Sequence, residues 1–374
     1  MEPVKLRVMA WNVGLGSRKK GFPPDADRAG KILRYVKEFQ VDVIALQEMA
    51  SRDYSIGLPS FNLSDFLNEE DNHLHSIHFE PGLSLPTRHS YPYGKLPKLN
   101  CQEGIVGQEQ GLGVWVRSVN NWRLRNLYTD DDGYPALVEV QRPLPHPLYM
   151  GDEPAPRDKE DERAYSAGRD QEDRPVLWSR LDKLDGSLNH VKIYFISLHL
   201  PTLSGEDKEI PVKAFNDTQM NIALNVLGLS KCRIWRYTVE KLASDLRTYA
   251  LRSIVAQAKR IKAYWKAQDE RNTCVFIMAG DFNFYHCNED LKDLRQEEIF
   301  LTSKGKGIVF KRAKSSGATR NKGGFLEGVW RERRIVDNIW VSGAKEVILK
   351  KGTGKMENIS DHYPVIADIK LDVA

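Results

Sequence analysis

Residues 275–283 read Val-Phe-Ile-Met-Ala-Gly-Asp-Phe-Asn. The first five are apolar and partly β-branched, which is typical of a buried strand, and Gly280 marks its end. Asp281 and Asn283 follow directly, so a carboxylate and an amide lie just past the strand. A polar side chain in this place is held by the sheet and still faces solvent, as catalytic groups on rigid scaffolds do. The stretch therefore predicts a sheet with a functional site at one edge.

Three other strand-like runs end in the same way. Asn12 follows a run that closes in Ala-Trp-Asn, Glu48 closes Ala-Leu-Gln-Glu, and His199 closes Ser-Leu-His. Any one of these residues, taken alone, is more often an ordinary turn residue than a ligand. Their recurrence at the ends of several strands favours one shared site.

The last part of the chain adds an aspartate and an Asp-His pair. Asp337 lies in the strand-like Ile-Val-Asp-Asn-Ile-Trp, and Asp361 and His362 lie in Ser-Asp-His-Tyr-Pro-Val, just before the final strand. A carboxylate beside an imidazole fixes its tautomer and raises its basicity, which phosphoester hydrolysis requires. The pattern indicates acid-base chemistry at the same edge.

Strand-like and helical runs alternate along the chain without an internal repeat. The runs of strand length and composition are 6–11, 41–46, 113–116, 136–140, 176–181, 191–199, 275–279, 334–341 and 364–369. Several alternate between apolar and polar residues, which predicts two packed sheets. Helical spacing appears at 27–38 and at about 238–267, where the second run has a basic outer face and has the length of a crossover helix between two strands.

We expect one α/β domain over residues 1–374. Two segments interrupt the alternation and are interpreted as insertions, the Pro- and acid-rich 142–174 and the mixed 203–237. The first is typical of a solvated surface loop, and the second is either a packed helical cap or a decoration that could recruit a protein partner.

The composition bounds the class of protein. Hydrophobic content of 41% and charged content of 28% are ordinary for a folded enzyme. The cysteines form no CxxC pair, so neither a zinc knuckle nor a disulfide framework is indicated. No run approaches the length of a membrane span, and the first strand-like run starts too early for a signal peptide, so we expect a cytoplasmic protein.

The charge is unevenly distributed although the formal net charge is only +4. Residues 151–173 hold nine acids and four bases, whereas 301–326 hold seven Lys or Arg and no acid. The two segments are expected to face different surroundings.

In these residues the chain resembles the endonuclease/exonuclease/phosphatase (DNase I-like) superfamily. Trp-Asn, Gln-Glu, His-Leu, Gly-Asp-Phe-Asn, an isolated strand aspartate and Ser-Asp-His occur in the order found in that superfamily, from Asn12 to His362. The resemblance implies a four-layer α/β/β/α sandwich with two mixed β-sheets packed face to face and the active site at one edge. It also implies metal-assisted in-line attack of water on a phosphoester, without a covalent intermediate.

The resemblance implies a metal site for Mg²⁺ or Mn²⁺. Glu48 would bind the ion with help from Asn12, and Asp361 could serve the same region. These hard cations favour oxygen ligands, which all three residues offer.

The resemblance also implies the catalytic roles. Asp281 would orient or deprotonate the attacking water and Asn283 would steady the phosphate. His362, paired with Asp337, and His199 would flank the phosphate and stabilise the charge that develops there.

Two positions near the site match the superfamily less closely. Arg174 precedes a strand where the deoxyribonuclease branch carries a substrate-contacting arginine, and a surface ion pair is an equally good reading. That branch orients the histidine equivalent to His199 with a glutamate, and Gln110, beside Glu109, falls nearest that place here. A histidine at 199 rather than a tyrosine disfavours abasic-site specificity.

The substrate remains open among three hypotheses. A nuclease is favoured by the basic segment 304–322, where Lys311, Arg312 and Arg320 could bind substrate phosphates. The alternative is a phosphoesterase acting on a phospholipid or inositol phosphate, for which the same segment would contact an anionic headgroup. A binding module without catalysis is disfavoured because Glu48, Asp281 and the Asp-His pair are all present.

Overall fold

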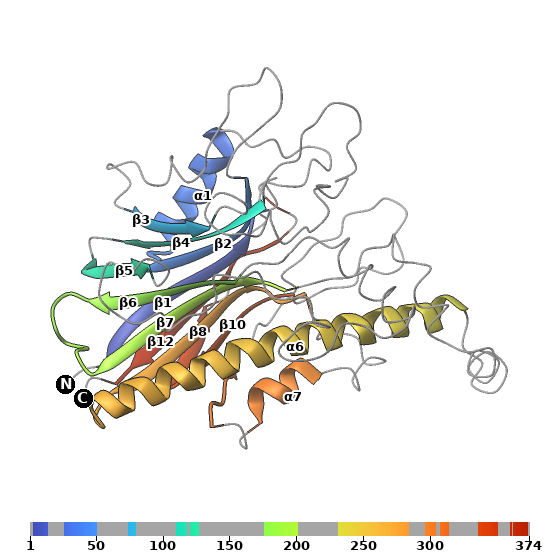
Figure 1. The fold of residues 1–374 in the computed structure, drawn as a ribbon. Helices are drawn as coiled ribbons and strands as arrows, with labels where there is room; N and C mark the ends of the chain where they lie inside the picture. The colour runs from blue at the N-terminus through green and yellow to red at the C-terminus, as the bar shows by residue number, and fades with distance from the viewer. Residues whose placement is uncertain are drawn as a thin grey trace, which may run out of the picture.

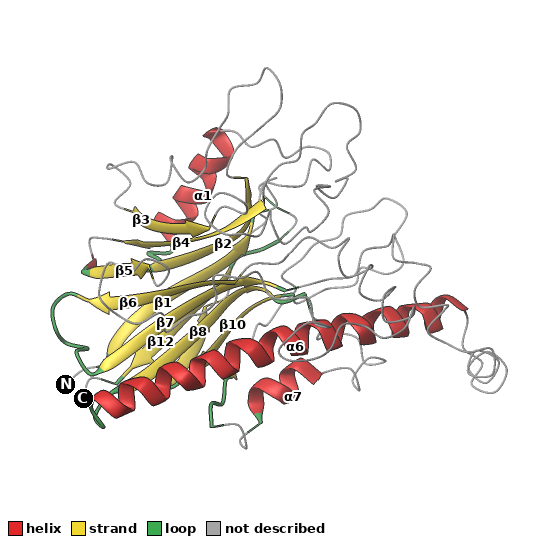
Figure 2. Cartoon of the chain, viewed as in Figure 1, coloured by secondary structure: helices red, strands yellow, loops and turns green. Residues whose placement is uncertain are grey.

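The computed structural model describes residues 3–13, 26–50, 74–79, 110–117, 120–126, 176–200, 231–283, 296–303, 307–313, 336–350, 360 and 362–372. This part of the chain forms strands and helices in an alternating order (Figures 1 and 2). In chain order they are β1 (Val4–Asn12), α1 (Ala26–Glu38), β2 (Val43–Ala50), β3 (Leu74–Phe79), β4 (Gln110–Arg117), β5 (Trp122–Asn126), β6 (Val176–Lys183), β7 (Val191–His199), α6 (Lys231–Gln268), β8 (Thr273–Asp281), α7 (Gln296–Thr302), β9 (Lys311–Arg312), β10 (Asp337–Ser342), β11 (Glu346–Lys350) and β12 (Val365–Leu371).

The strands form two mixed sheets of six strands each. The first has the order β11-β12-β1-β2-β4-β3, and β1 runs parallel to β2 and antiparallel to β12. The second has the order β5-β6-β7-β8-β10-β9, and β7 runs parallel to β8, which is antiparallel to β10. Strands from both ends of the chain therefore lie at the centre of the first sheet.

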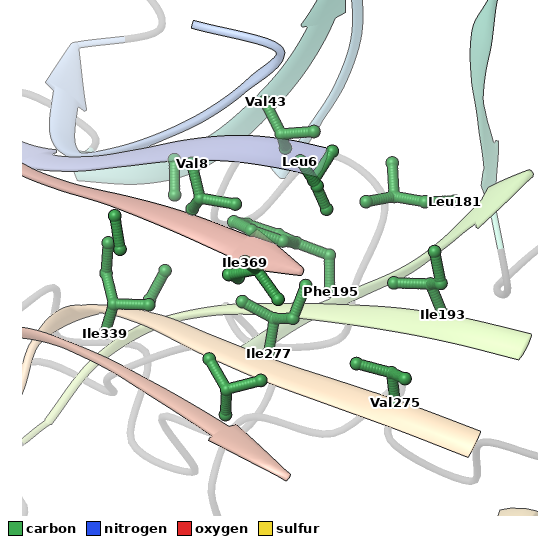
Figure 3. Close-up of a cluster of buried hydrophobic side chains, with 14 of the residues drawn as sticks. Leu6, Val8, Val43, Leu181, Ile193, Phe195, Val275, Ile277, Ile339 and Ile369 are labelled. Atoms are coloured by element: carbon green, nitrogen blue, oxygen red, sulfur yellow. The ribbon is translucent and has the colours of Figure 1, made fainter. Parts of the chain in front are cut away.

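Alternation along the strands builds the core between the sheets (Figure 3). On β1, Leu6 and Val8 point into the cluster that also contains Phe195 of β7 and Ile277 of β8, and all four are buried. Because successive strand residues face opposite sides, Met9 and Trp11 pack outward instead. The two sheets thus share one apolar layer.

Helices cover the outer face of each sheet. The apolar side of α1, with Ile32 and Val36, packs on Met9 and Trp11 of the first sheet. The apolar sides of α6 and α7 pack with Trp178 and other outward residues of the second sheet. The expected four-layer α/β/β/α arrangement is confirmed.

Helix α6 makes the crossover between the parallel strands β7 and β8, as expected. Its 38 residues span roughly 57 Å at 1.5 Å per residue, whereas the nine residues of β8 span roughly 30 Å. The helix therefore extends past the end of the sheet (Figure 1). It begins at Lys231 rather than near residue 238, so the end of the expected insertion 203–237 belongs to α6. Residues 142–174 and 203–230 lie outside the described residues.

No helix in the described ranges is long and apolar enough to cross a membrane.

Candidate active site

The strand register brings three of the predicted residues into one row. His199 lies opposite Asp281 in the parallel β7–β8 pair, and Asp337 lies opposite Asp281 in the antiparallel β8–β10 pair. All three side chains are at least 95% buried. Adjacent strands thus place a carboxylate between an imidazole and a second carboxylate at one edge of the second sheet.

Two hydrogen bonds hold the carboxylate of Asp281. Its Oδ1 accepts from the backbone N–H of Asn283 at 2.9 Å, and its Oδ2 accepts from Nδ2 of Asn12 at 3.1 Å. The first is a local turn contact of the kind that Asp makes two residues along the chain. The second comes from β1 in the other sheet, so residues 269 positions apart meet at the same edge.

Two histidines flank this carboxylate. Nε2 of His199 lies 3.6 Å from Oδ2 of Asp281, and Nδ1 of His362 lies 3.9 Å from the same oxygen. Nδ1 of His362 also lies 2.8 Å from Oδ2 of the fully buried Asp337. A carboxylate at this distance accepts the Nδ1 proton and assigns the neutral imidazole the tautomer whose Nε2 is the basic atom. The predicted Asp337–His362 pair is therefore brought together.

Backbone geometry next to Asp281 is specialised. Gly280 has φ 153°, and a Cβ built there would lie 1.9 Å from the carbonyl oxygen of Leu198. Asn283 has φ 53°, in the left-handed region that Asn tolerates better than most residues, and its Nδ2 donates to the carbonyl of Leu200 at 2.8 Å. The close approach of β7 and β8 thus requires glycine beside the central carboxylate.

Two residues next to the predicted ones position them. Nε1 of Trp11 donates to the carbonyl of His362 at 3.1 Å, and Oγ of Ser360 donates to the carbonyl of Asn12 at 2.7 Å. Ser360 also accepts from the backbone N–H of His362 at 3.1 Å. Both residues belong to the motifs Trp-Asn and Ser-Asp-His, but sequence reasoning predicted no role for them. Their closeness in sequence to Asn12 and His362 could have indicated a positioning role.

Gln47 is a further polar residue that sequence reasoning missed. It lies opposite Asn12 in the β1–β2 register, is fully buried, and donates from Nε2 to Oγ of Ser197 in the other sheet at 3.4 Å. The β2–β4 register shifts between Leu46 and Met49, which marks a β-bulge. Bulges beside active sites re-aim side chains, and this one includes Gln47 and Glu48.

Of the three predicted metal ligands, one has a described side chain. Asn12 is buried at this edge, Glu48 follows Gln47 in β2 and is described by its backbone alone, and Asp361 lies outside the described residues. The residues on either side of Asp361 are Ser360 and His362, which contact the carbonyl of Asn12 and the Asp281 cluster. An amide and carboxylates are the oxygen donors that Mg²⁺ prefers, so the chemistry of this donor set fits such an ion.

A second group could also hold a metal. Asp281, Asp337 and His362 offer ligand atoms within 4.8 Å of one another. The 2.8 Å contact between His362 and Asp337 is, however, the length of a charge-assisted hydrogen bond. The geometry of this pair is therefore compatible with proton transfer as well as with metal binding.

Of the predicted substrate-binding residues, the two that the structure describes do not join this cluster. Lys311 and Arg312 form the edge strand β9 rather than part of a loop, and Arg312 lies opposite Trp340 of β10. Trp340 is three residues past Asp337, which is roughly 10 Å along a strand. Arg174, Arg320 and Glu109 lie outside the described residues, and Gln110 is described by its backbone alone, as the first residue of β4.

The sequence and the fold were compared with known proteins. A search of curated protein sequences returned no match. Among solved structures, an endonuclease/exonuclease/phosphatase from Beutenbergia cavernae matches with a TM-score of 0.51 and 15% identity, over 98% of this chain and 72% of that chain. At this identity the likeness shows the fold alone.

Two further solved structures match over most of their length. TDP2 from D. rerio, complexed with a single-strand DNA product, has a TM-score of 0.44 and 15% identity over 98% of both chains. The human Nocturnin catalytic domain with bound sulfate has a TM-score of 0.47 and 14% identity over 98% of this chain and 94% of that chain. The sequence profile of the Endonuclease/Exonuclease/phosphatase family matches residues 9–362, nearly the whole chain. The chain therefore belongs to this family, whose members are phosphoric ester hydrolases that depend on divalent metals.

Proposed function

We propose that the protein is a nuclease that hydrolyses phosphodiester bonds of nucleic acid with Mg²⁺ or Mn²⁺. The observation that carries the hydrolytic part is the cluster around Asp281. Its carboxylate is held by two hydrogen bonds and lies between two imidazoles, one of which is paired with Asp337. Such an arrangement can position a water and stabilise charge on both sides of a phosphate.

Each residue of the cluster has a distinct task in this proposal. Asp281 orients the attacking water and takes its proton, and Asn283 donates a hydrogen bond to the phosphate. His362, with Nδ1 held by Asp337, faces the phosphate through Nε2, and His199 stabilises its other side.

Asn12, Glu48 and Asp361 would hold the metal, whose chemistry is to polarise the phosphate and neutralise developing negative charge. Because Asn12 also donates to Asp281, the metal site and the water-orienting carboxylate share one side chain. A change at Asn12 should therefore disturb both metal affinity and catalysis.

Two features support nucleic acid as the substrate class. The segment 301–326 carries seven bases and no acid, and Lys311 within it is exposed on β9. An enzyme that acts on lipid usually also has a group of exposed apolar residues that anchors it to the membrane. Among the described residues the large exposed hydrophobics are Leu184 and Ile299, which come from separate elements.

We further propose that residues 1–374 act as one catalytic domain. The site takes side chains from β1 and from Ser360 and His362, and β1 pairs directly with β12, so both ends of the matched region are needed for one edge. Residues 142–174 and 203–230 are then insertions, and the second is the segment we would test for a protein partner.

The test compares the wild type with Asp281→Asn on labelled single- and double-stranded DNA, RNA, sphingomyelin and an inositol polyphosphate. Each substrate is incubated with Mg²⁺, with Mn²⁺ or with EDTA, and product is quantified. We expect nucleic acid to be cut only with metal and only by the wild type. Turnover of the lipid or inositol substrate alone would contradict the nuclease assignment and leave the hydrolytic site intact.

A further inference from the structure

The outward face of α6 carries a row of cations that the proposed active site does not use. Arg252, Lys259 and Lys266 are exposed and are spaced seven residues apart, which is roughly 10.5 Å per step along a helix. Seven residues are nearly two helical turns, so the three side chains lie on one face. We call these three residues the α6 cation row.

The α6 cation row has no acidic counterpart in the described part of the chain. Residues 247–268 contain no Asp or Glu, and no ion pair is found there for Arg252, Lys259 or Lys266. Other surface cations of the described ranges do have such partners, since Arg271 pairs with Asp269 and Lys370 with Glu346. The row is therefore a local excess of positive charge rather than one half of a salt-bridge network.

The residues between these cations leave room for a partner. Ala256 and Ala263 occupy the same face between successive cations and are exposed. At these two positions between the cations, a short side chain leaves space for an approaching backbone. Among the described side chains of α6 none is a large exposed hydrophobic, whereas a membrane-binding helix requires such residues in addition to its cations.

The direction of α6 connects the row to the candidate active site. In chain order the helix lies between β7, which ends at His199, and β8, which ends at Asp281. Because both strands run toward the catalytic edge, α6 runs back along the second sheet from that edge (Figure 1). A linear polyanion lying along the row would point at the catalytic edge.

We propose that the α6 cation row binds the phosphate backbone of a nucleic-acid strand outside the active site. The identity of the polyanion rests on the proposed nuclease function, whereas the binding surface itself rests on the charge and geometry of α6. A long substrate would be held by the row while its reactive phosphate lies at Asp281. A short substrate would reach only the catalytic edge.

The experiment measures binding of a labelled single-stranded oligonucleotide to the Asp281→Asn protein over a range of salt concentrations. The test variant adds Arg252→Gln, Lys259→Gln and Lys266→Gln. The matched control adds Arg34→Gln, Lys37→Gln and Arg123→Gln, exposed cations of α1 and β5. The Asp281→Asn protein has one acid fewer than the natural sequence, whose formal net charge is +4, and each triple change removes three positive charges from it, so global charge is equal in both.

We expect the test variant to lose about two units of the slope of log K against log salt, since each phosphate contact on a single strand contributes about 0.7. At about 0.1 M salt this corresponds to binding weaker by up to about a hundredfold. The control should keep the wild-type slope. Equal slopes for the test and control variants would overturn the proposal.

Cleavage separates this proposal from the nuclease assignment. In the presence of a catalytic Asp281, the test variant should cut a short oligonucleotide with wild-type kcat and KM and a long one with raised KM. If nucleic acid binds through the α6 cation row but none is cut, the nuclease assignment is wrong and the row remains a binding surface. Row-dependent binding to anionic vesicles or to an acidic protein, with none to nucleic acid, would overturn the choice of partner.

Discussion

Two buried polar groups of this protein are built on opposite principles. On the outer face of the first sheet, Arg7 binds Asp368 through two hydrogen bonds of 2.6 and 3.2 Å, and Lys5 lies 2.9 Å from the same carboxylate. At the catalytic edge, the carboxylate of Asp281 is instead surrounded by amide donors and imidazoles. One group pairs opposite charges, and the other brings potential acids and bases together.

The two groups differ in the charge states that they stabilise. The hydrogen bond to Asp368 raises the pKa of Arg7, and burial alone would raise the pKa of Asp368, but its bonds to Arg7 and Lys5 lower it overall. Both shifts favour the charged, paired state and hence the fold. Two carboxylates near one another, by contrast, repel when both are ionised. We infer that the Arg7–Asp368 group contributes to stability and that the Asp281 group is retained for chemistry.

Exchanging each central carboxylate for an amide should separate activity from stability. Asp281→Asn removes the proposed water-orienting base, and we expect kcat to fall by about 10²–10⁴-fold while the free energy of unfolding changes by at most about 1 kcal/mol. Asp368→Asn should keep kcat and lower the free energy of unfolding by about 2 kcal/mol, because Arg7 and Lys5 lose their charged partner. Steady-state kinetics and urea unfolding measure both effects.

The comparison breaks down if the two changes behave alike. A strongly destabilised Asp281→Asn protein would mean that the catalytic-edge carboxylate also supports the fold. Asp281→Glu serves as a further control, since it keeps the charge but moves the carboxylate by one methylene.

The partner of His362 provides the next test. Asp337→Asn keeps the shape of the side chain but removes the negative acceptor for Nδ1, so the imidazole can take the other tautomer. We expect kcat to fall by about a hundredfold with little change in KM for a long substrate. NMR of the imidazole nitrogens should show the tautomer change, which a merely structural effect would not produce.

The approach of β7 and β8 can be tested at Gly280. Gly280→Ala places a Cβ against the carbonyl of Leu198 and forces an unfavourable φ, so we expect a loss of about 3 kcal/mol or more in the free energy of unfolding. Activity should fall as well, because His199 and Asp281 lie in register at this point. Gly30→Ala is the matched control.

Gly30 lies inside α1 with no atom within 4 Å of a Cβ built there. Its replacement should stabilise the protein by about 0.5–1 kcal/mol, because Ala favours the helix. Equal effects of the two substitutions would show that the strands separate easily at Gly280.

Long apolar runs made the centre of each sheet predictable. The strands β7 and β8 agree with the predicted 191–199 and 275–279 because Val, Ile and Phe recur there on buried faces. All four edge strands, β3, β5, β9 and β11, were missed. In β5 and β11 the cause is that Arg123, Arg125 and Glu346 interrupt the apolar pattern. Charged residues protect sheet edges, and the same residues conceal them from sequence analysis.

The site was predictable as a set of residues but not as a geometry. Polar residues at the ends of strands pointed to Asn12 and Asp281, and the Asp-His pair before the final strand pointed to His362. Which atom contacts which depends on register and on the packing of one sheet on the other, so the contact from Asn12 to Asp281 could not be predicted. Nε2 of His199 lies 3.6 Å from Oδ2 of Asp281, and the expected partner near Gln110 lies outside the described side chains.

The last prediction concerns how the free energy of unfolding falls at acid pH, and it tests whether Asp368 stabilises the fold. Its folded pKa is lower than the ordinary 3.8, so the folded state binds a proton less tightly than the unfolded chain. The resulting stabilisation is fully present above about 3.8 and is lost as pH falls through the folded pKa. The difference in unfolding free energy between wild type and Asp368→Asn should therefore be constant from about pH 7 to about pH 5 and shrink by up to about 1 kcal/mol toward about pH 3. Urea unfolding at each pH measures this difference.

Arg7→Gln should reduce this pH dependence, since it removes one of the two cations that favour the ionised carboxylate. A difference that stays constant down to about pH 3 would mean that Asp368 gains nothing from its cations, and the contrast between a stabilising and a catalytic polar group would then rest on geometry alone.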